Sequence, residues 1–248
     1  WPAGSCVAVL ASGHLLSVGV DWRALFLGLA ALTACVALWF PSARKAPLPA
    51  SRADFSHIRE ILSLRRFWIF GAALAFSGGA EGAFAFWSAS YIQINFAALP
   101  RAGAFGTAAF AVGMAAGRLA SSRLAGRFGL KRLIVASLSV ALASSLSFFL
   151  ISDLPTLYAF LFFMGLSIAC LWPSIQSYAG AELSVDPTVL MIFLSCFGLP
   201  GFFSATLVMG IIGDARGLKT SFVVAPVYVA CALLLMLAEK KGARRLPS

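Results

Sequence analysis

The strongest constraint on this chain is a series of apolar blocks long enough to cross a lipid bilayer. A bilayer core of about 30 Å needs roughly 20 apolar residues in a helix. A helix also satisfies its own backbone hydrogen bonds, which lipid cannot do. We therefore expect an all-α membrane protein, with a third block long enough to tilt or project beyond the bilayer. The predicted spans are 2–20, 24–40, 67–96, 103–122, 133–151, 157–178, 189–212 and 221–237.

The composition agrees with this assignment. Hydrophobic residues make up 60% of the 248 residues and charged residues only 11%, whereas a soluble domain has about 25% charged residues. The five cysteines all lie in apolar blocks and form no C-x-x-C pair. We interpret them as small core residues, and we expect no metal site and no cofactor.

Positive charge is distributed unequally between alternate loops. Four of the 19 Lys and Arg residues, Arg23, Arg101, Arg216 and Lys219, fall on one side. The remaining residues mark the other side, together with both ends of the chain, as cytoplasmic. This asymmetry explains the net charge of +10 through topology and anionic lipid, so we expect no nucleic-acid partner. We predict a multi-pass protein of a cell membrane, a bacterial inner membrane. The cytoplasmic set is Arg44, Lys45, Arg52, Arg59, Arg65, Arg66, Arg118, Arg123, Arg127, Lys131, Arg132, Lys240, Lys241, Arg244 and Arg245.

One long polar stretch, residues 41–66, interrupts the spans. Its Pro-rich first half is typical of a linker. From Ser56 onward it can form a short amphipathic helix that lies on the membrane surface. The apolar side of that helix would carry Ile58, Ile61, Leu62 and Leu64. We predict four regions: residues 1–40, the cytoplasmic loop 41–66, a six-helix bundle at 67–239 and a basic tail at 240–248.

One loop carries a family resemblance. Residues 113–132, GMAAGRLASSRLAGRFGLKR, resemble the cytoplasmic loop between helices eight and nine of the major facilitator superfamily. That family's pattern is G-x-x-x-D-R-x-G-R-R, and Arg127, Gly129 and Lys131 match three of its positions. The sequence departs from the pattern at Ser122, Gly126 and Leu130. The Asp of the pattern is absent, which removes one partner of the ion pair that the family places at this loop.

The resemblance implies a layout and a function. In that family a long cytoplasmic loop separates helix six from helix seven, so the eight spans would be helices five to twelve. The chain opens on Trp1-Pro2 and would be a C-terminal fragment, with the first half of the same protein as its partner. Residues 79–84 and 165–175 look like the fucose-permease-like branch. The implied function is secondary active transport by alternating access. The implied gating residues are Arg118, Arg123, Arg127, Gly129, Lys131 and Arg132.

Glu81 is the sharpest single feature of the sequence. It is the only acidic residue inside an apolar span, about midway along the third. A charge at the bilayer centre costs roughly 2.5–3.5 kcal/mol, and a carboxylate avoids that cost by taking a proton. Glu81 is therefore a candidate for binding a proton, a substrate or both. The alternative is a structural carboxyl, hydrogen-bonded to a neighbouring helix that Gly78 and Gly82 allow to approach closely.

Further candidates share a face with Glu81 or belong to another span. Ser77, Glu81, Phe84, Ser88 and Tyr91 follow helical spacing along one face and are predicted to line a cavity. In the span 157–178, Trp172 and Gln176 are predicted to line the same cavity, next to a possible helix break at Pro173. A second break is possible at Pro200 in the span 189–212.

These features favour a transporter for a small solute, with the proton as the coupling ion. Uptake of a sugar or similar metabolite is the first interpretation, and proton-driven efflux of amphiphilic compounds is the second. A receptor of the same fold that does not transport is a distant alternative. An intramembrane enzyme needs a convergent catalytic set, and the chain has two histidines, His14 and His57, and no H-E-x-x-H motif. We therefore expect no enzyme.

Overall fold

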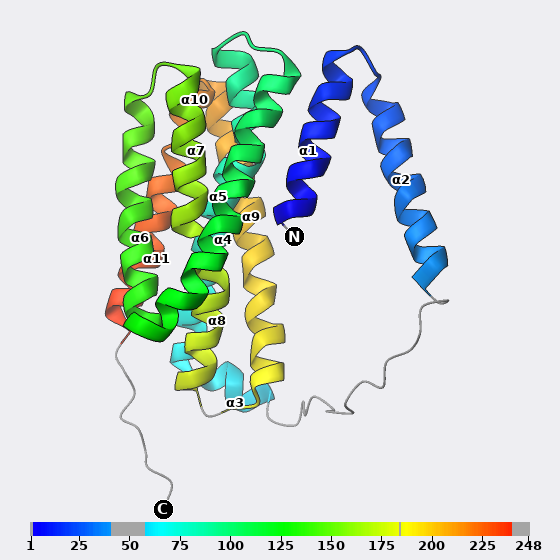
Figure 1. Ribbon diagram of the computed structural model, residues 1–248. Coiled ribbons are helices and arrows are strands. Elements are labelled where there is room, and N and C mark those ends of the chain that lie inside the picture. Colours follow the sequence, from blue (N-terminus) through cyan, green and yellow to red (C-terminus); the bar gives the residue numbers. More distant parts are fainter. Residues whose placement is uncertain (1, 41–57, 184, 240–248) are drawn as a thin grey trace, which may run out of the picture.

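The computed structural model describes residues 2–40, 58–183 and 185–239 of the chain. Within these ranges the protein is all-α (Figure 1). Residues 41–57 of the predicted loop 41–66, and the predicted basic tail at 240–248, lie outside the described residues. The helices are α1 (Pro2–Ser17), α2 (Trp22–Trp39), α3 (Ile58–Ser63), α4 (Arg65–Asn95), α5 (Pro100–Phe128), α6 (Leu130–Ser147) with the 3-10 turn η3 (Phe148–Leu150), α7 (Leu154–Ile168), α8 (Leu171–Glu182), α9 (Pro187–Arg216), α10 (Leu218–Ser221) and α11 (Val224–Ala238).

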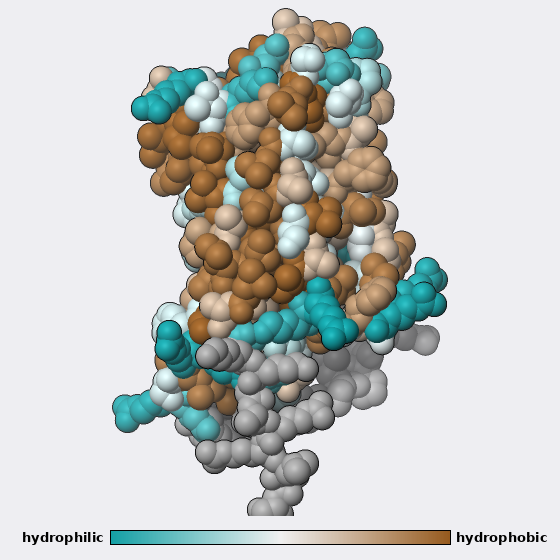
Figure 2. All heavy atoms as spheres, turned by 90° about the vertical axis from the view of Figure 1, so that its left-hand side faces the viewer, coloured by the Kyte–Doolittle hydropathy of each residue, from teal (hydrophilic) through white to brown (hydrophobic). Residues whose placement is uncertain are grey.

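Every predicted span corresponds to one helix or to two consecutive helices. Six of these segments in the described ranges are long and apolar enough to cross a membrane. The third span is the longest helix, α4, with 31 residues. Figure 2 shows an apolar band between two ends where hydrophilic side chains gather. The fold is therefore the expected all-α membrane bundle.

Helix ends at the polar margins are fixed by carboxylate caps. Asp153 accepts a hydrogen bond from the Thr156 backbone N–H at 2.9 Å at the start of α7. Asp186 accepts from the backbone N–H groups of Thr188 and Val189, both at 2.9 Å, at the start of α9. Each cap satisfies donors that the first helical turn leaves unpaired. The backbone hydrogen bond from Thr156 also holds the pKa of Asp153 below its ordinary value.

The two prolines behave differently. α7 ends at Ile168 and α8 begins at Leu171, so the sixth span breaks just before Pro173. Pro173 then occupies the first turn of α8, where a missing N–H costs little. α9 continues through Pro200 without interruption, so the possible break there is not realised. Only the first of the two predicted breaks is confirmed.

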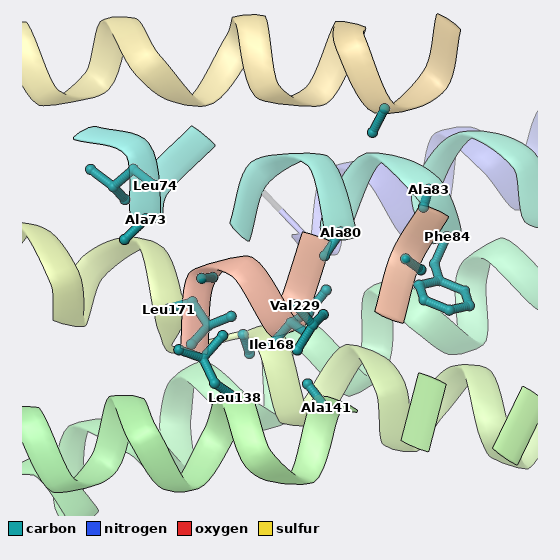
Figure 3. Close-up of a cluster of buried hydrophobic side chains, with 14 of the residues drawn as sticks. Ala73, Leu74, Ala80, Ala83, Phe84, Leu138, Ala141, Ile168, Leu171 and Val229 are labelled. Carbon is teal, nitrogen blue, oxygen red and sulfur yellow. The ribbon is translucent and has the colours of Figure 1, made fainter. Parts of the chain in front are cut away.

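The bundle is built around α4, which packs against α5, α8, α9 and α11. Small and large apolar side chains of α4 and of the surrounding helices pack together in this core (Figure 3). The backbones of α4 and α9 approach closely, and a Cβ on Gly201 would lie 1.9 Å from the Ala75 carbonyl oxygen. A side chain at that position is incompatible with the observed spacing, so glycine is what lets the two helices touch.

The G-x-x-x-G face of α5 packs within the same bundle. A Cβ on Gly113 would lie 2.0 Å from the Phe162 carbonyl oxygen, and one on Gly117 would lie 2.6 Å from the Leu166 carbonyl oxygen. Both contacts are with α7. Close approach through small residues is the usual way in which membrane helices gain packing energy.

α1 joins the bundle through α5. A Cβ on Gly13 would lie 2.2 Å from the Ala104 Cβ. The Ser17 hydroxyl accepts a hydrogen bond at 2.9 Å from the backbone N–H of Arg101, in the first turn of α5. This contact lies at the end of the bundle opposite α3 (Figure 1). None of the residues of α2 is buried.

A charged cluster joins the helices at the other end, which we call the basic end. Glu239, directly after α11, has a fully buried side chain. Its carboxylate is paired with Arg66 of α4 and accepts a bond at 3.0 Å from Lys131 of α6. Tyr178 of α8 donates to the same carboxylate at 2.9 Å, and Arg66 also pairs with Glu182 at 2.9 Å. Four helices are held together by one buried carboxylate.

The predicted surface helix is present but short. α3 covers residues 58–63, where Ile61 is buried and Leu62 is exposed. The Trp68 indole N–H donates to the Leu62 carbonyl oxygen at 2.9 Å, which ties α3 to the start of α4.

Candidate functional site

A cavity of about 490 Å³ lies where α4, α5, α8 and α9 meet. Most of its wall is apolar or aromatic, and two ionisable side chains, Glu81 and Arg118, reach it from different helices. We call it the Glu81 cavity. Its lining residues are Gly78, Glu81, Arg118, Trp172, Gly198, Leu199, Phe202 and Phe203.

Glu81 and Arg118 form the electrostatic centre of this cavity. Glu81 is half-buried on α4 and Arg118 is half-buried on α5, and their opposite charges attract each other. A charge attracts its partner far more strongly in a low-dielectric interior than in water. Removing Arg118 would leave the charge of Glu81 beside a mostly apolar wall, which is unfavourable.

A second cavity of about 520 Å³ adjoins the first toward the basic end. We call it the serine cavity, because hydroxyl groups of α5 and α8 dominate its polar surface. The two cavities share Arg118 and Trp172. The serine cavity is lined by Arg118, Ser121, Ser122, Ala125, Leu130, Trp172, Pro173, Ser174, Gln176 and Ser177.

The position of Trp172 depends on a glycine of the facing helix. A Cβ on Gly198 would lie 1.8 Å from the Trp172 ring, so the indole packs directly on the α9 backbone. The neighbouring Gln176 donates to the Ser195 hydroxyl at 2.9 Å, which links α8 to α9 one turn further. The Trp172 indole and the Gln176 amide thus lie on the same side of α8, between α5 and α9.

The structure brings some of the predicted cavity residues together. Glu81 and Trp172 line the Glu81 cavity, and Trp172 and Gln176 line the serine cavity. Pro173 and Ser177 lie beside them in the serine cavity. The predicted meeting of the third and sixth spans at one site is present in this arrangement.

Four other candidates on the Glu81 face lie in the core. Phe84 is fully buried, with its ring centroid 5.6 Å from that of Phe160 and 5.5 Å from that of Phe222. The ring centroid of Tyr91 lies 5.1 Å from that of Phe148. These four residues are buried because this face of α4 points into the bundle. Glu81 lies at the edge of the face, on the side of Gly78, where α9 approaches α4. The four residues are Ser77, Phe84, Ser88 and Tyr91.

The predicted gating residues occupy three different settings. Arg118 lines both cavities, whereas Arg123, Arg127 and Arg132 are exposed. Lys131 belongs to the buried cluster around Glu239. Gly129 joins α5 to α6 with φ +80°, a backbone conformation open mainly to glycine. These residues lie on the end of α5, the start of α6 and the single residue between them, and they do not form one site.

Sequence reasoning missed the α9 wall of the Glu81 cavity. Leu199, Phe202 and Phe203 line it, but an aromatic pair in an apolar span is normally lipid-facing or core. Phe202 and Phe203 directly follow Pro200-Gly201, and this was the sequence feature that could have indicated a cavity wall. Sequence reasoning also missed Ser121, Ser122 and Ser174, because serine is common in membrane helices. In the part of the chain that the structure describes, no group of three His, Cys, Asp or Glu side chains could hold a metal ion.

A bundle of apolar helices with two opposite charges in a cavity defines the class of a polytopic membrane protein. The family model of the Major Facilitator Superfamily matches residues 1–181. The chain belongs to this superfamily. The match covers α1 through most of α8, and therefore includes both Glu81 and Arg118.

Two further comparisons agree with this assignment. The chain is 32% identical over 165 residues to the membrane protein MosC of Rhizobium meliloti, covering 65% of this chain and 40% of MosC. Its fold is similar, with a TM-score of 0.60 and 16% identity, to a bacterial homologue of the human lysosomal transporter Spinster in an inward-facing, unoccupied conformation. That similarity covers 92% of this chain and 64% of the homologue. The chain thus spans less than two thirds of either relative.

Proposed function

We propose that the protein containing this chain is a secondary active transporter that moves a small solute by alternating access and couples it to protons through Glu81. The observation that carries the proposal is the Glu81–Arg118 pair inside the cavity between α4, α5, α8 and α9. In the family layout a solute site lies between two halves of the protein. The described helices would supply one wall of it.

Proton coupling follows from the chemistry of the pair. Ionised Glu81 is attracted to Arg118, and a proton on Glu81 removes that attraction. A carboxyl group is charged where water reaches it and neutral where the protein excludes water. Its protonation therefore changes the free energies of the inward-facing and outward-facing conformations by different amounts. The proton would therefore bias which side of the membrane the cavity faces.

The α1–α5 contact supports an assignment of the present conformation. Gly13, Ser17, Arg101 and Ala104 close the bundle at the end opposite the basic end. The distribution of positive charge predicts that the basic end is cytoplasmic, and with that orientation we propose that this conformation faces inward. The Spinster homologue was also observed facing inward.

The lining favours a solute with an apolar body over a sugar. A polyhydroxylated solute needs many hydrogen-bonding partners, because each unpaired buried polar group costs free energy. The Glu81 cavity instead offers Leu199, Phe202 and Phe203 around its single charge pair. An amphiphilic solute, which the efflux interpretation also requires, fits this lining better.

The test is solute-dependent proton flux in proteoliposomes that contain the full-length protein. We expect flux in the native protein and its loss in Glu81→Gln, because the amide cannot take up or release a proton. Asp214→Asn is the matched control, since Asp214 is an exposed carboxylate of α9 that lines neither cavity. Unchanged flux in Glu81→Gln contradicts the coupling role. The direction of flux distinguishes symport from antiport.

A further inference from the structure

Arg118 lies between two cavities of different chemical character. On one side is the Glu81 cavity, whose wall is mainly Leu199, Phe202 and Phe203. On the other is the serine cavity, with four hydroxyl groups and one amide. Because Arg118 and Trp172 line both, the two cavities form one continuous surface with an apolar part and a polar part.

The charges on this surface are few. Among the described residues that line the two cavities, Glu81 and Arg118 are the only ionisable ones. α8 contributes Trp172, Ser174, Gln176 and Ser177, and α9 contributes glycine and apolar side chains. The formal charge of the joined lining is therefore zero when Glu81 is ionised and +1 when Glu81 carries a proton. The polar part itself contains one cation and no carboxylate.

We propose that the solute is an organic monoanion with an apolar body, an inference that rests on the transport function proposed above. Its anionic group binds Arg118 at the edge of the serine cavity, and its apolar body lies in the Glu81 cavity against Trp172 and Phe202. A guanidinium group presents several donors in a fixed fork, which suits a carboxylate, sulfonate or phosphate oxygen pair. Hydroxyl groups such as those of Ser174 and Ser177 can donate to the remaining oxygens.

This arrangement couples the anion to the proton. An anion at Arg118 competes with ionised Glu81 for the same guanidinium group. A proton on Glu81 ends the competition and leaves the lining with one net positive charge. Because binding coupling is reciprocal, the anion also favours the proton on Glu81. The inference therefore favours symport of a proton with an anion over exchange of a proton for a cation.

The test uses two probes of equal chain length and permanent opposite charge, 1-octanesulfonate and octyltrimethylammonium. Binding to the full-length protein in lipid nanodiscs is measured between pH 5.5 and pH 8. We expect octanesulfonate to bind and Arg118→Gln to weaken it by roughly tenfold or more. Arg123→Gln is the matched control, because Arg123 is an exposed residue of the same helix that lines neither cavity.

The pH dependence gives a second readout. The sulfonate stays ionised throughout, so tighter binding at lower pH reports the proton on the protein. We expect that dependence in the native protein and its loss in Glu81→Gln. Octyltrimethylammonium binding as tight as that of octanesulfonate overturns the proposal. So does octanesulfonate binding that Arg118→Gln leaves unchanged.

Two further measurements keep the outcome decisive. If Arg118→Gln does not fold, Ser177→Leu fills the polar end from an exposed position and is expected to weaken octanesulfonate binding, whereas unchanged binding overturns the site. Arg118-dependent binding without transport of any solute supports this site and contradicts the proposed function. Proton-coupled transport of a cationic or neutral solute alone supports the proposed function and contradicts this site.

Discussion

Glu81 of α4 and Arg118 of α5 line one cavity and interact electrostatically across it. Two consecutive helices thus contribute opposite charges to an otherwise apolar wall. The pair accounts for how a carboxylate is tolerated midway along a membrane-spanning helix, since a nearby cation lowers the cost of its charge. It also makes Arg118 the residue through which proton and solute can act on each other.

Replacing either member of this pair is expected to destabilise the protein more than replacing both. Arg118→Gln removes the cation that attracts Glu81, and Glu81→Gln removes the carboxylate that attracts Arg118. Residues in one ion pair typically show interaction energies of about 0.5–3 kcal/mol in a double-mutant cycle. Thermal unfolding of the two single variants and the double variant in detergent measures this energy. If the loss of stability in the double variant equals the sum of the losses in the two single variants, the two side chains do not interact.

The buried cluster at the basic end is expected to make stability depend on pH. Burial acts to raise the pKa of Glu239, but hydrogen bonds from Arg66, Lys131 and Tyr178 outweigh it and hold this pKa below its ordinary value of 4.5. A carboxylate with a depressed folded-state pKa contributes stability that is present above pH 4.5. That contribution is lost as pH falls through the folded-state pKa.

Glu239→Gln tests this directly. We expect it to lower the free energy of unfolding at pH 7 by about 3 kcal/mol, because it leaves two cations without their shared carboxylate. We also expect the variant to lose part of the acid sensitivity of the native protein between pH 5 and pH 3. Asp214→Asn again serves as the exposed control. Parallel stability curves for native and Glu239→Gln protein across that range would show that the cluster is not the cause.

Substitution of Gly201 is expected to separate α4 from α9. A Cβ there would lie 1.9 Å from the Ala75 carbonyl oxygen, and overpacking of this kind costs about 1–3 kcal/mol or more. Gly201→Ala should therefore lower the unfolding temperature and deform the Glu81 cavity. Gly180→Ala is the control, because a Cβ at Gly180 in α8 meets nothing within 4 Å. Equal unfolding temperatures for the two variants would contradict the observed helix contact.

The α1–α5 contact is expected to control access at the end opposite the basic end. Gly13→Leu places a branched side chain at a position where even a Cβ would lie 2.2 Å from the Ala104 Cβ. The two helices must therefore separate. An Ala104→Cys substitution, buried here, should then react faster with a membrane-impermeant maleimide added to that side. Gly28→Leu is the control, since a Cβ on Gly28 of α2 meets nothing within 4 Å. Labelling of Ala104→Cys that is the same in both backgrounds would contradict a closing role.

The sequence predicted the order of the helical segments because apolar length is a local property. Eight spans were predicted, whereas six segments of the described ranges are long and apolar enough to cross a membrane. It also predicted the break before Pro173. It did not predict that α9 continues through Pro200, since continuity depends on how the helix packs. The glycines that flank Pro200, Gly198 and Gly201, both touch neighbouring helices, and this support is a tertiary property.

The candidate site was predictable only in part, for a similar reason. Helical spacing placed Phe84 and Tyr91 on the face of Glu81, but spacing does not say whether a face meets a cavity or other helices. The Glu239 cluster was not predictable at all. Its carboxylate pairs with Arg66, 173 positions away, and with Lys131, 108 positions away. Pairings over such separations follow from how helices assemble and leave no local pattern.

The most direct test of the account asks whether water reaches position 81. In the full-length protein without its native cysteines, Glu81→Cys and Val140→Cys are compared, since Val140 is an exposed apolar residue midway along α6. We predict that Glu81→Cys reacts readily with a charged, water-soluble thiol reagent and that Val140→Cys, facing lipid, reacts slowly. A cysteine at position 81 that is as unreactive as the one at position 140 would contradict a solvent-filled cavity around the charge pair.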